Sequence, residues 1–305
     1  MTHRRSEDTI QTPTAGKEVN LIVWTTEYGP GASATPSYVL NQVNTTQCAQ
    51  PSGQKTAITP IFWEPGFASN YEVFISALIQ RYQNNPSIGY VRFGLGTGGE
   101  DFPLPSFTAP QCLSQLRSYG YSPQVWLNYT YRMLDYEASL HSQKQLMVGI
   151  NSIPSQNGSI VDLVAARAVQ DGIGFGSQGL TSLDIQRYKD NVSCAADWCN
   201  LFSKYAGRVP LELQTYSASS PDGSGIGSLP QMLSFALSLH TQIFEVYVQD
   251  FLTAYAPPFQ NYSEFHASYA QAFENTAAVV GSSAVQSSAN SLGMIVCGEC
   301  WSVRS

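Results

Sequence analysis

The sequence predicts an α/β fold with the architecture of a (β/α)8 barrel. Short runs of apolar and β-branched residues alternate along the chain with segments whose apolar residues recur at helical spacing. Strands that alternate with helices form right-handed βαβ units, so we expect the strands to lie parallel in one sheet. A glycine-rich loop that ends in a carboxylate follows one of these strands, and barrel enzymes place their catalytic groups at such strand ends.

The apolar runs predict six strands, over residues 19–24, 88–93, 145–150, 172–175, 209–214 and 243–248. Helical spacing predicts helices over residues 69–82, 110–118, 123–142, 160–170, 182–206, 228–240 and 262–277. We expect residues 1–17 to form a flexible N-terminal segment, 18–280 the barrel domain and 281–305 a Ser/Ala-rich tail. Six βα units are too few for a closed barrel of eight and would also suit an open, doubly wound sheet, so the motifs must decide.

The composition excludes several classes of protein. The 305 residues carry a formal net charge of −7, with 12% charged, 12% aromatic and 43% hydrophobic residues. The aromatic and hydrophobic content argues against disorder, and the acidic balance argues against nucleic acid or an anionic membrane as partner. No apolar run approaches the roughly 20 residues that a membrane span needs. We therefore expect a soluble, globular protein.

The polar residues indicate a secreted glycoprotein. Ser, Thr, Gln and Asn dominate over charge, and N-glycosylation sequons occur at Asn44, Asn128, Asn157, Asn191 and Asn261. The six cysteines could form disulfides; they are Cys48, Cys112, Cys194, Cys199, Cys297 and Cys300. The Cys297–Cys300 CxxC has no second CxxC and no nearby His, which favours a structural disulfide or free thiols over a redox or metal site. The first residues lack the apolar region of a signal peptide, so we expect that the natural N-terminus is missing.

The loop from Gly94 to Gly99 matches G-x-G-x-x-G and follows a predicted strand, but its context excludes a dinucleotide site. A Rossmann loop leads straight into a helix that holds the pyrophosphate. Here the next residues are Glu100-Asp-Phe-Pro-Leu-Pro105, which cannot begin a helix at once and would repel a diphosphate. We expect the glycines instead to let the chain turn sharply and to let a substrate approach the backbone.

Four segments between residues 60 and 103 resemble a known family. They are Phe62-Trp-Glu-Pro65, Ala77-Leu-Ile-Gln-Arg-Tyr82, Asn85-Pro-Ser-Ile-Gly-Tyr90 and Gly94-Leu-Gly-Thr-Gly-Gly-Glu100. Together they resemble the fourth βα unit of clan-A-type TIM-barrel glycoside hydrolases, a group that includes cellulases and β-galactosidases. In that family the glycine-rich loop closes on the acid/base glutamate, which implies this role for Glu100. The family usually has Asn before that glutamate, whereas this chain has Gly99.

The resemblance also implies a numbering of the strands. If Glu100 follows the fourth barrel strand, residues 19–24 form the third strand, 209–214 the seventh and 243–248 the eighth. The first two strands would then precede this chain, so we expect an N-terminally truncated barrel.

Glycoside hydrolysis uses two carboxyl groups, one as acid and one as nucleophile or base. The family places its nucleophile on strand seven, which implies Glu212. Glu245 on strand eight is the rival, because both glutamates alternate with apolar residues and a glutamate within an apolar strand is costly unless it is paired or lines a site. Either one could instead be a structural carboxylate bonded to Arg92 or to a tyrosine.

Sugar sites combine flat aromatic surfaces with polar groups. The candidate substrate-binding residues stand at or near predicted strand ends: Trp24, Glu27, Trp63, Glu64, Asp101, Gln214, Tyr216 and Tyr247. The expected substrate is an oligo- or polysaccharide, and no cofactor or metal is implied because no histidine has a partner at metal spacing. Two other functions stay open: a carbohydrate-binding barrel without catalysis, and an inactive fragment of a glycosidase.

Overall fold

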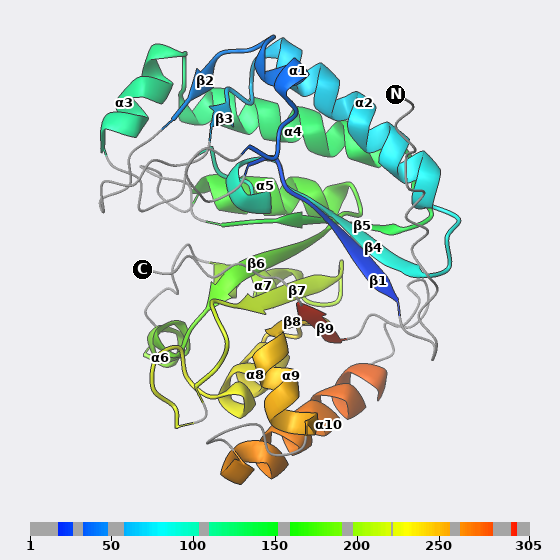
Figure 1. Cartoon of the computed structure of the whole chain (residues 1–305), viewed down its shortest axis with the longest axis vertical. Helices are drawn as coiled ribbons and strands as arrows, with labels where there is room; N and C mark the ends of the chain where they lie inside the picture. The colour runs from blue at the N-terminus through cyan, green and yellow to red at the C-terminus, as the bar shows by residue number, and fades with distance from the viewer. Residues whose placement is uncertain are drawn as a thin grey trace, which may run out of the picture.

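The computed structural model describes residues 18–26, 33–47, 58–103, 110–151, 159–190, 198–220, 222–256, 263–282 and 294–297. Seven strands in these ranges form one parallel sheet, in the order β1-β4-β5-β6-β7-β8-β9. The sheet curls into half a barrel (Figure 1). Its strands are β1 (Val19–Val23), β4 (Ile88–Phe93), β5 (Gln145–Gly149), β6 (Gly174–Leu180), β7 (Leu211–Thr215), β8 (Ile243–Tyr247) and β9 (Met294–Cys297).

The order of the strands decides between the two architectures that the sequence left open. Each strand of the sheet pairs with the next one along the chain, and the order never reverses within the described sheet. A doubly wound sheet requires such a reversal at its switch point. The fold is therefore an α/β half-barrel, which is compatible with a partial (β/α) barrel.

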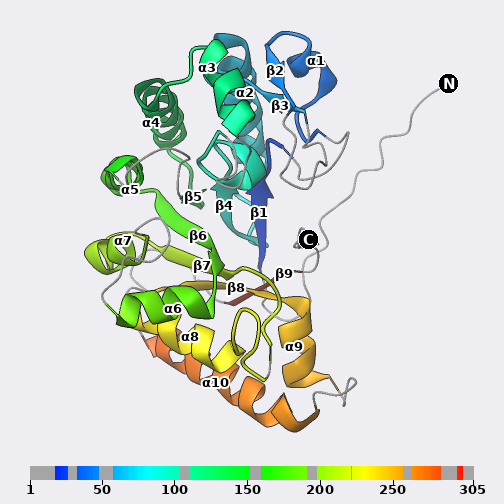
Figure 2. The same ribbon diagram turned by 90° about the vertical axis from the view of Figure 1, so that its left-hand side faces the viewer.

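The helices lie on the convex side of the curled sheet (Figure 2). They are α1 (Ser37–Leu40), α2 (Pro65–Tyr82), α3 (Pro110–Ser118), α4 (Pro123–Ser139), α5 (Ser159–Gln170), α6 (Ser182–Lys189), α7 (Trp198–Tyr205), α8 (Leu229–Ser238), α9 (Val248–Tyr255) and α10 (His266–Ser282). Two 3-10 turns, η1 (Thr97–Gly99) and η3 (Ser263–Phe265), and an antiparallel pair, β2 (Thr45–Thr46) with β3 (Thr59–Pro60), complete the described elements. None of the described helices is long and apolar enough to cross a membrane.

Several predicted boundaries differ from the structure. Helix α2 begins at Pro65 rather than at Ser69. Proline is favoured in the first helical turn, because backbone N–H groups there have no acceptor within the helix and the missing N–H of proline costs no hydrogen bond. The helix predicted over 182–206 is two helices, α6 and α7, and α6 starts at a capping box between Thr181 and Asp184. Strand β6 extends to Leu180, five residues beyond its predicted end. Strand β9 lies within the predicted tail and pairs with β8.

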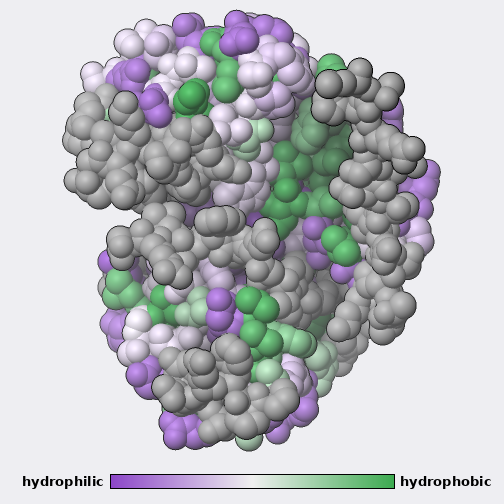
Figure 3. All heavy atoms as spheres, viewed as in Figure 1, coloured by the Kyte–Doolittle hydropathy of each residue, from purple (hydrophilic) through white to green (hydrophobic). Residues whose placement is uncertain are grey.

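The two faces of the sheet bury different side chains. Residues that alternate along the strands, such as Val91, Val148 and Leu213, join the large apolar core, which lies between the sheet and the helices. On the concave face, Tyr90, Met147 and Ile243 form a separate small apolar cluster. Buried charged residues share that concave face, as the next section describes. Figure 3 shows that the molecule is hollowed near its middle, with hydrophobic residues on part of the wall.

Two cysteines have described side chains, Cys112 and Cys199, and both are buried and disulfide-bonded. Cys48, Cys194 and Cys300 lie outside the described residues, and of Cys297 only the backbone is described. Among the predicted sequons, Asn44 and Asn128 are exposed, whereas Asn157, Asn191 and Asn261 fall outside the described ranges.

Candidate active site

The glycine-rich loop after β4 carries Glu100 and folds tightly on itself. A Cβ atom at Gly94 would overlap the backbone at Gly99, and one at Gly96 would overlap the backbone of Phe102. Gly98 and Gly99 have φ angles of 68° and 77°, in the left-handed region that favours glycine. The sharp turn is thus as expected, but the space beside Gly94 and Gly96 is filled by the loop itself. The expectation that these two glycines let a substrate approach the backbone is therefore wrong.

The loop directs the Glu100 side chain into the protein, where it is 5% exposed. The Gln178 amide donates to Glu100 Oε1 at 2.9 Å, and Asn151 also hydrogen-bonds this carboxyl group. Glu100 Oε2 is buried without a hydrogen-bond partner. Burial raises the pKa of Glu100 to about 8; Asn151 opposes this rise, Asp101 adds to it and Arg92 opposes it. Glu100 is therefore a carboxyl group that holds its proton near neutral pH.

The next residue, Asp101, is fully buried and anchors the loop. Its Oδ1 accepts a hydrogen bond from the backbone N–H of Asn151 at 2.8 Å, and its carbonyl accepts one from the Trp126 indole at 2.7 Å. Burial raises the pKa of Asp101 to about 7, although the hydrogen bonds that its carboxyl group accepts from backbone N–H groups lower it. Asp101 ties the end of β5 to the loop, which is a structural contact in addition to the substrate-binding role predicted for it.

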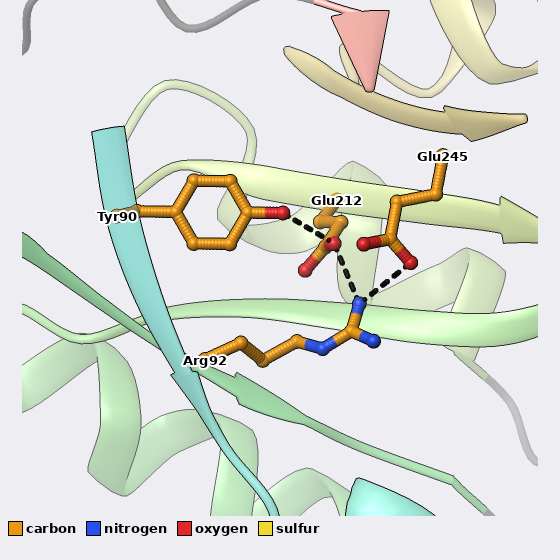
Figure 4. Close-up of polar contacts among 4 residues, drawn as sticks. All are labelled: Tyr90, Arg92, Glu212 and Glu245. Atoms are coloured by element: carbon orange, nitrogen blue, oxygen red, sulfur yellow. Dashed lines mark hydrogen bonds and ion pairs between the residues drawn. The ribbon is translucent and has the colours of Figure 1, made fainter. Parts of the chain in front are cut away.

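Arg92 holds the two other candidate glutamates on the concave face (Figure 4). Its Nη1 lies 2.6 Å from Glu212 Oε1 and 2.9 Å from Glu245 Oε2. The Tyr90 hydroxyl donates to Glu212 Oε1 at 2.8 Å. All four side chains are buried. The structure thus contains the arrangement considered as an alternative from the sequence, in which Arg92 or a tyrosine binds a buried carboxylate: Arg92 binds both glutamates, and Tyr90 binds Glu212.

The Arg92 cluster has an excess of acid. Burial raises the pKa of Glu212, the Arg92 guanidinium lowers it, and the facing Glu245 carboxyl raises it again. One guanidinium cannot neutralise two carboxylates, and an uncompensated charge in a buried site is expensive. Glu212 therefore holds a proton more readily than a solvated carboxylate does.

Two glycines in register on neighbouring strands leave room for Glu100 and Glu212. Gly149 on β5 is the register partner of Gly176 on β6, and neighbouring strands lie about 4.8 Å apart. A Cβ atom at Gly149 would lie 3.6 Å from Glu100 Cγ, and one at Gly176 would lie 2.8 Å from Glu212 Cβ. The two glutamate side chains thus occupy the room that these glycines leave. Any larger residue at Gly176 would displace Glu212.

The structure brings some of the predicted binding residues to this site. Trp24 follows β1, and its indole Nε1 would lie 3.0 Å from a Cβ atom at Gly99, one residue before Glu100. Gln214 is buried on β7, in register with Glu245 and Gln178. Trp24 and Gln214 lie at or near the carboxyl ends of their strands, whereas Glu212 lies near the start of β7 and Glu245 in the middle of β8.

Tyr216 and Tyr247 lie at the same strand ends. Tyr216 follows β7 and is 62% exposed, which suits a surface for stacking. The buried Tyr247 donates from its hydroxyl to the Tyr216 carbonyl at 3.0 Å. This bond joins the ends of β7 and β8.

Two other candidates have contacts elsewhere. The Trp63 indole donates to the Tyr119 carbonyl at 2.9 Å, and Trp63 packs against the large core beneath the helices. Glu64 accepts from the backbone and the side chain of Asn44 at 2.9 and 2.7 Å. These contacts give both residues a structural role in the part of the protein that contains α2. The remaining candidate, Glu27, lies outside the described residues.

The sequence reasoning missed Gln178, Asn151 and the paired glycines. Gln178 lies beyond the predicted end of its strand, so the sequence did not indicate on which face of the sheet its side chain lies. The signal for Gly149 and Gly176 was present, because glycine within an apolar strand often marks a close approach of another group.

The fold and site define an α/β half-barrel with a buried cluster of acidic side chains on its concave face. No family model, curated protein or solved structure matches the chain. Across the described ranges, no group of three or more His, Cys, Asp or Glu residues could hold a metal ion.

Proposed function

We propose that this chain hydrolyses an O-glycosidic bond, with Glu100 as the general acid/base and Glu212 as the second carboxylate. The observation that carries the proposal is the Glu100 carboxyl group itself. It is buried in the loop after β4, has one oxygen without a hydrogen-bond partner, and is linked to Glu212 through Gln178 and Arg92. Two neighbouring carboxyl groups in different environments are what glycoside hydrolysis requires.

The environments suit different roles. The raised pKa of Glu100 keeps a proton available for the leaving oxygen, as a general acid requires. Arg92 and Tyr90 both bind Glu212 Oε1 and lower its pKa, which favours the ionised form that acts as nucleophile or base. Burial and the Glu245 carboxyl raise the pKa of Glu212 by more than these contacts lower it, so Glu212 has to lose a proton before it takes that role. Arg92 also binds Glu245, which is the third glutamate of the buried cluster. A separation of roughly 5–5.5 Å between the two acting carboxyl groups corresponds to retention, and roughly 6.5–9.5 Å to inversion.

The proposal includes three further expectations. The substrate is an oligo- or polysaccharide, for which Trp24 and Tyr216 provide aromatic surfaces near the strand ends. The complete architecture is a (β/α)8 barrel, supported by the sheet order. The protein acts outside the cell, supported by the disulfide-bonded Cys112 and Cys199 and by the exposed sequon at Asn128.

One observation favours a second candidate, a carbohydrate-binding barrel without catalysis. Arg92 already binds one oxygen of each of Glu212 and Glu245, so both carboxyl groups have a protein partner without a substrate. In that case Glu212 supports the fold, and only the aromatic residues at the strand ends contact sugar.

The test is hydrolysis by the purified chain on panels of aryl glycosides and polysaccharides, compared with Glu100→Gln. Glu137→Gln is the matched control, because Glu137 is a buried glutamate on α4, outside the concave face. A glycosidase loses activity in the first variant and keeps it in the control. A folded wild-type chain that binds glycans but hydrolyses none of them would support the binding barrel instead.

A further inference from the structure

Gln178 links the two parts of the acidic cluster. It lies on β6, half-buried, in register with Gln214 on the neighbouring strand. With its amide oriented to satisfy both neighbours, Gln178 donates from Nε2 to Glu100 Oε1 at 2.9 Å. Its Oε1 accepts from Arg92 Nη2 at 2.6 Å. Since Arg92 Nη1 binds Glu212 and Glu245, hydrogen bonds run without interruption from Glu100 to both of these glutamates.

An amide is well suited to this position. The Arg92 guanidinium has only donors, and an ionised Glu100 has only acceptors, so the group between them must accept on one side and donate on the other. A carboxylate here would bind Arg92 but repel Glu100, and an ammonium group would do the reverse. The neutral amide satisfies both without adding charge to a buried site that already has an excess of acid.

The contacts also distinguish the two oxygens of Glu100. Oε1 receives the Gln178 amide, whereas Oε2 has no hydrogen-bond partner. A protonated carboxyl group that accepts at one oxygen carries its proton on the other. The proton of Glu100 is therefore placed on Oε2, the oxygen without a protein partner.

We propose that Gln178 is a positioning residue that directs the Glu100 proton to Oε2 and stabilises the carboxylate left when that proton departs. This inference rests on the proposed function for its role in the reaction. The proton moves from Oε2 to the glycosidic oxygen, the bond between that oxygen and the anomeric carbon breaks, and its electron pair stays with the departing oxygen. The anomeric carbon forms its new bond to the Glu212 carboxylate, or to a water molecule whose proton Glu212 accepts. Negative charge then develops on Glu100, where the Gln178 N–H strengthens its hydrogen bond to Oε1.

Other groups also act on Glu100 and must stay constant in a test. Arg92 faces it from β4, Asp101 follows it in the loop, and Asn151 hydrogen-bonds it from the end of β5. Arg92 is held at Nη1 by two glutamates, so it cannot readily move to replace a lost amide. Methionine fills nearly the same volume as glutamine without polar donors, which makes Gln178→Met the appropriate change.

The experiment titrates the Glu100 carboxyl group by infrared or carbon NMR spectroscopy, with Glu100→Gln to identify its signal. We expect its pKa to rise by roughly one pH unit in Gln178→Met, because a donor to the charged form is lost. Gln178→Glu adds a negative charge and raises the pKa as well. Gln145→Met is the matched control. Among the described residues, Gln145 bonds only to backbone carbonyls at the opposite end of β5, so this change leaves the titration unchanged.

An unchanged Glu100 titration in both Gln178 variants would overturn the inference. In an active enzyme, the alkaline limb of kcat/KM follows the same shift as the titration, which a merely structural residue would not produce. If no glycoside is hydrolysed by the wild-type chain, the proposed function fails on its own, while the titration still decides the role of Gln178.

Discussion

Replacing Arg92 by methionine tests whether its positive charge stabilises the buried glutamates on the concave face. Arg92 Nη1 binds Glu212 and Glu245 at 2.6 and 2.9 Å, and all three side chains are buried. Arg92→Met keeps much of the side-chain volume but removes the only cation that contacts these two carboxyl groups in the described structure. Both glutamates are then buried without a positive charge in contact with them, and of the two only Glu212 keeps the hydrogen bond from Tyr90.

The magnitude follows from that loss. Breaking a buried ion pair by removing one partner costs roughly 3–5 kcal/mol. A loss of 1 kcal/mol lowers the Tm of a domain of this size class by roughly 2–4 °C, so we expect a fall in Tm of about 10 °C near pH 7. The variant has a higher folded-state pKa at Glu212 than wild type, because the guanidinium that lowers this pKa is gone. A raised carboxyl pKa costs stability as the pH rises above the unfolded value, so the defect is smaller at pH 4 than at pH 7.

The assay is urea and thermal unfolding at pH 4 and pH 7. Arg132→Met is the matched control, because Arg132 pairs with Glu72 at 2.8 Å but its side chain is 46% exposed. This exposed pair is worth about 1 kcal/mol or less. Adding Glu212→Gln and Glu245→Gln to Arg92→Met should recover part of the lost stability, since no buried charge remains. An Arg92→Met defect no larger than that of the control, or equal at both pH values, would refute the reasoning.

Three further predictions concern other buried groups. Glu137 is buried with neither oxygen hydrogen-bonded, and burial raises its pKa, so Glu137→Gln should gain stability over wild type as the pH rises above about 4.5, measured by urea unfolding. Gly176→Ala should lower the free energy of unfolding by about 1–3 kcal/mol, because its Cβ would lie 2.8 Å from Glu212 Cβ. Tyr90→Phe removes the 2.8 Å hydrogen bond to Glu212 and should cost about 1.5–3 kcal/mol near neutral pH; an unchanged unfolding curve would contradict this.

The strands were predictable because their side chains alternate or form continuous apolar runs. Strands β4, β7 and β8 appear where the sequence placed them, and their alternation correctly indicated buried glutamates at Glu212 and Glu245. Strand β6 was only partly recognised, because Gly-Phe-Gly-Ser-Gln-Gly-Leu has few apolar side chains to reveal a period.

The site was harder to predict than the fold. The loop context indicated an inward Glu100, and the sequence could name Arg92 as a partner of a buried glutamate. It could not show that one nitrogen of Arg92 binds both Glu212 and Glu245, more than 100 residues away along the chain, because that contact depends on strand register and sheet curvature. Gln178 escaped for the same reason, since its importance lies in its two neighbours rather than in any local motif.

The most direct test of the central claim compares leaving groups. A general acid matters most when the leaving oxygen is a poor leaving group, and much less for an activated aryl glycoside. We therefore measure kcat/KM of wild type, Glu100→Gln and the Glu137→Gln control on an activated aryl glycoside and on an unactivated oligosaccharide with the same sugar. We expect kcat/KM of Glu100→Gln to fall roughly 10²–10⁴-fold on the oligosaccharide and far less on the aryl glycoside. An equal loss on both substrates, or no loss on either, would contradict it.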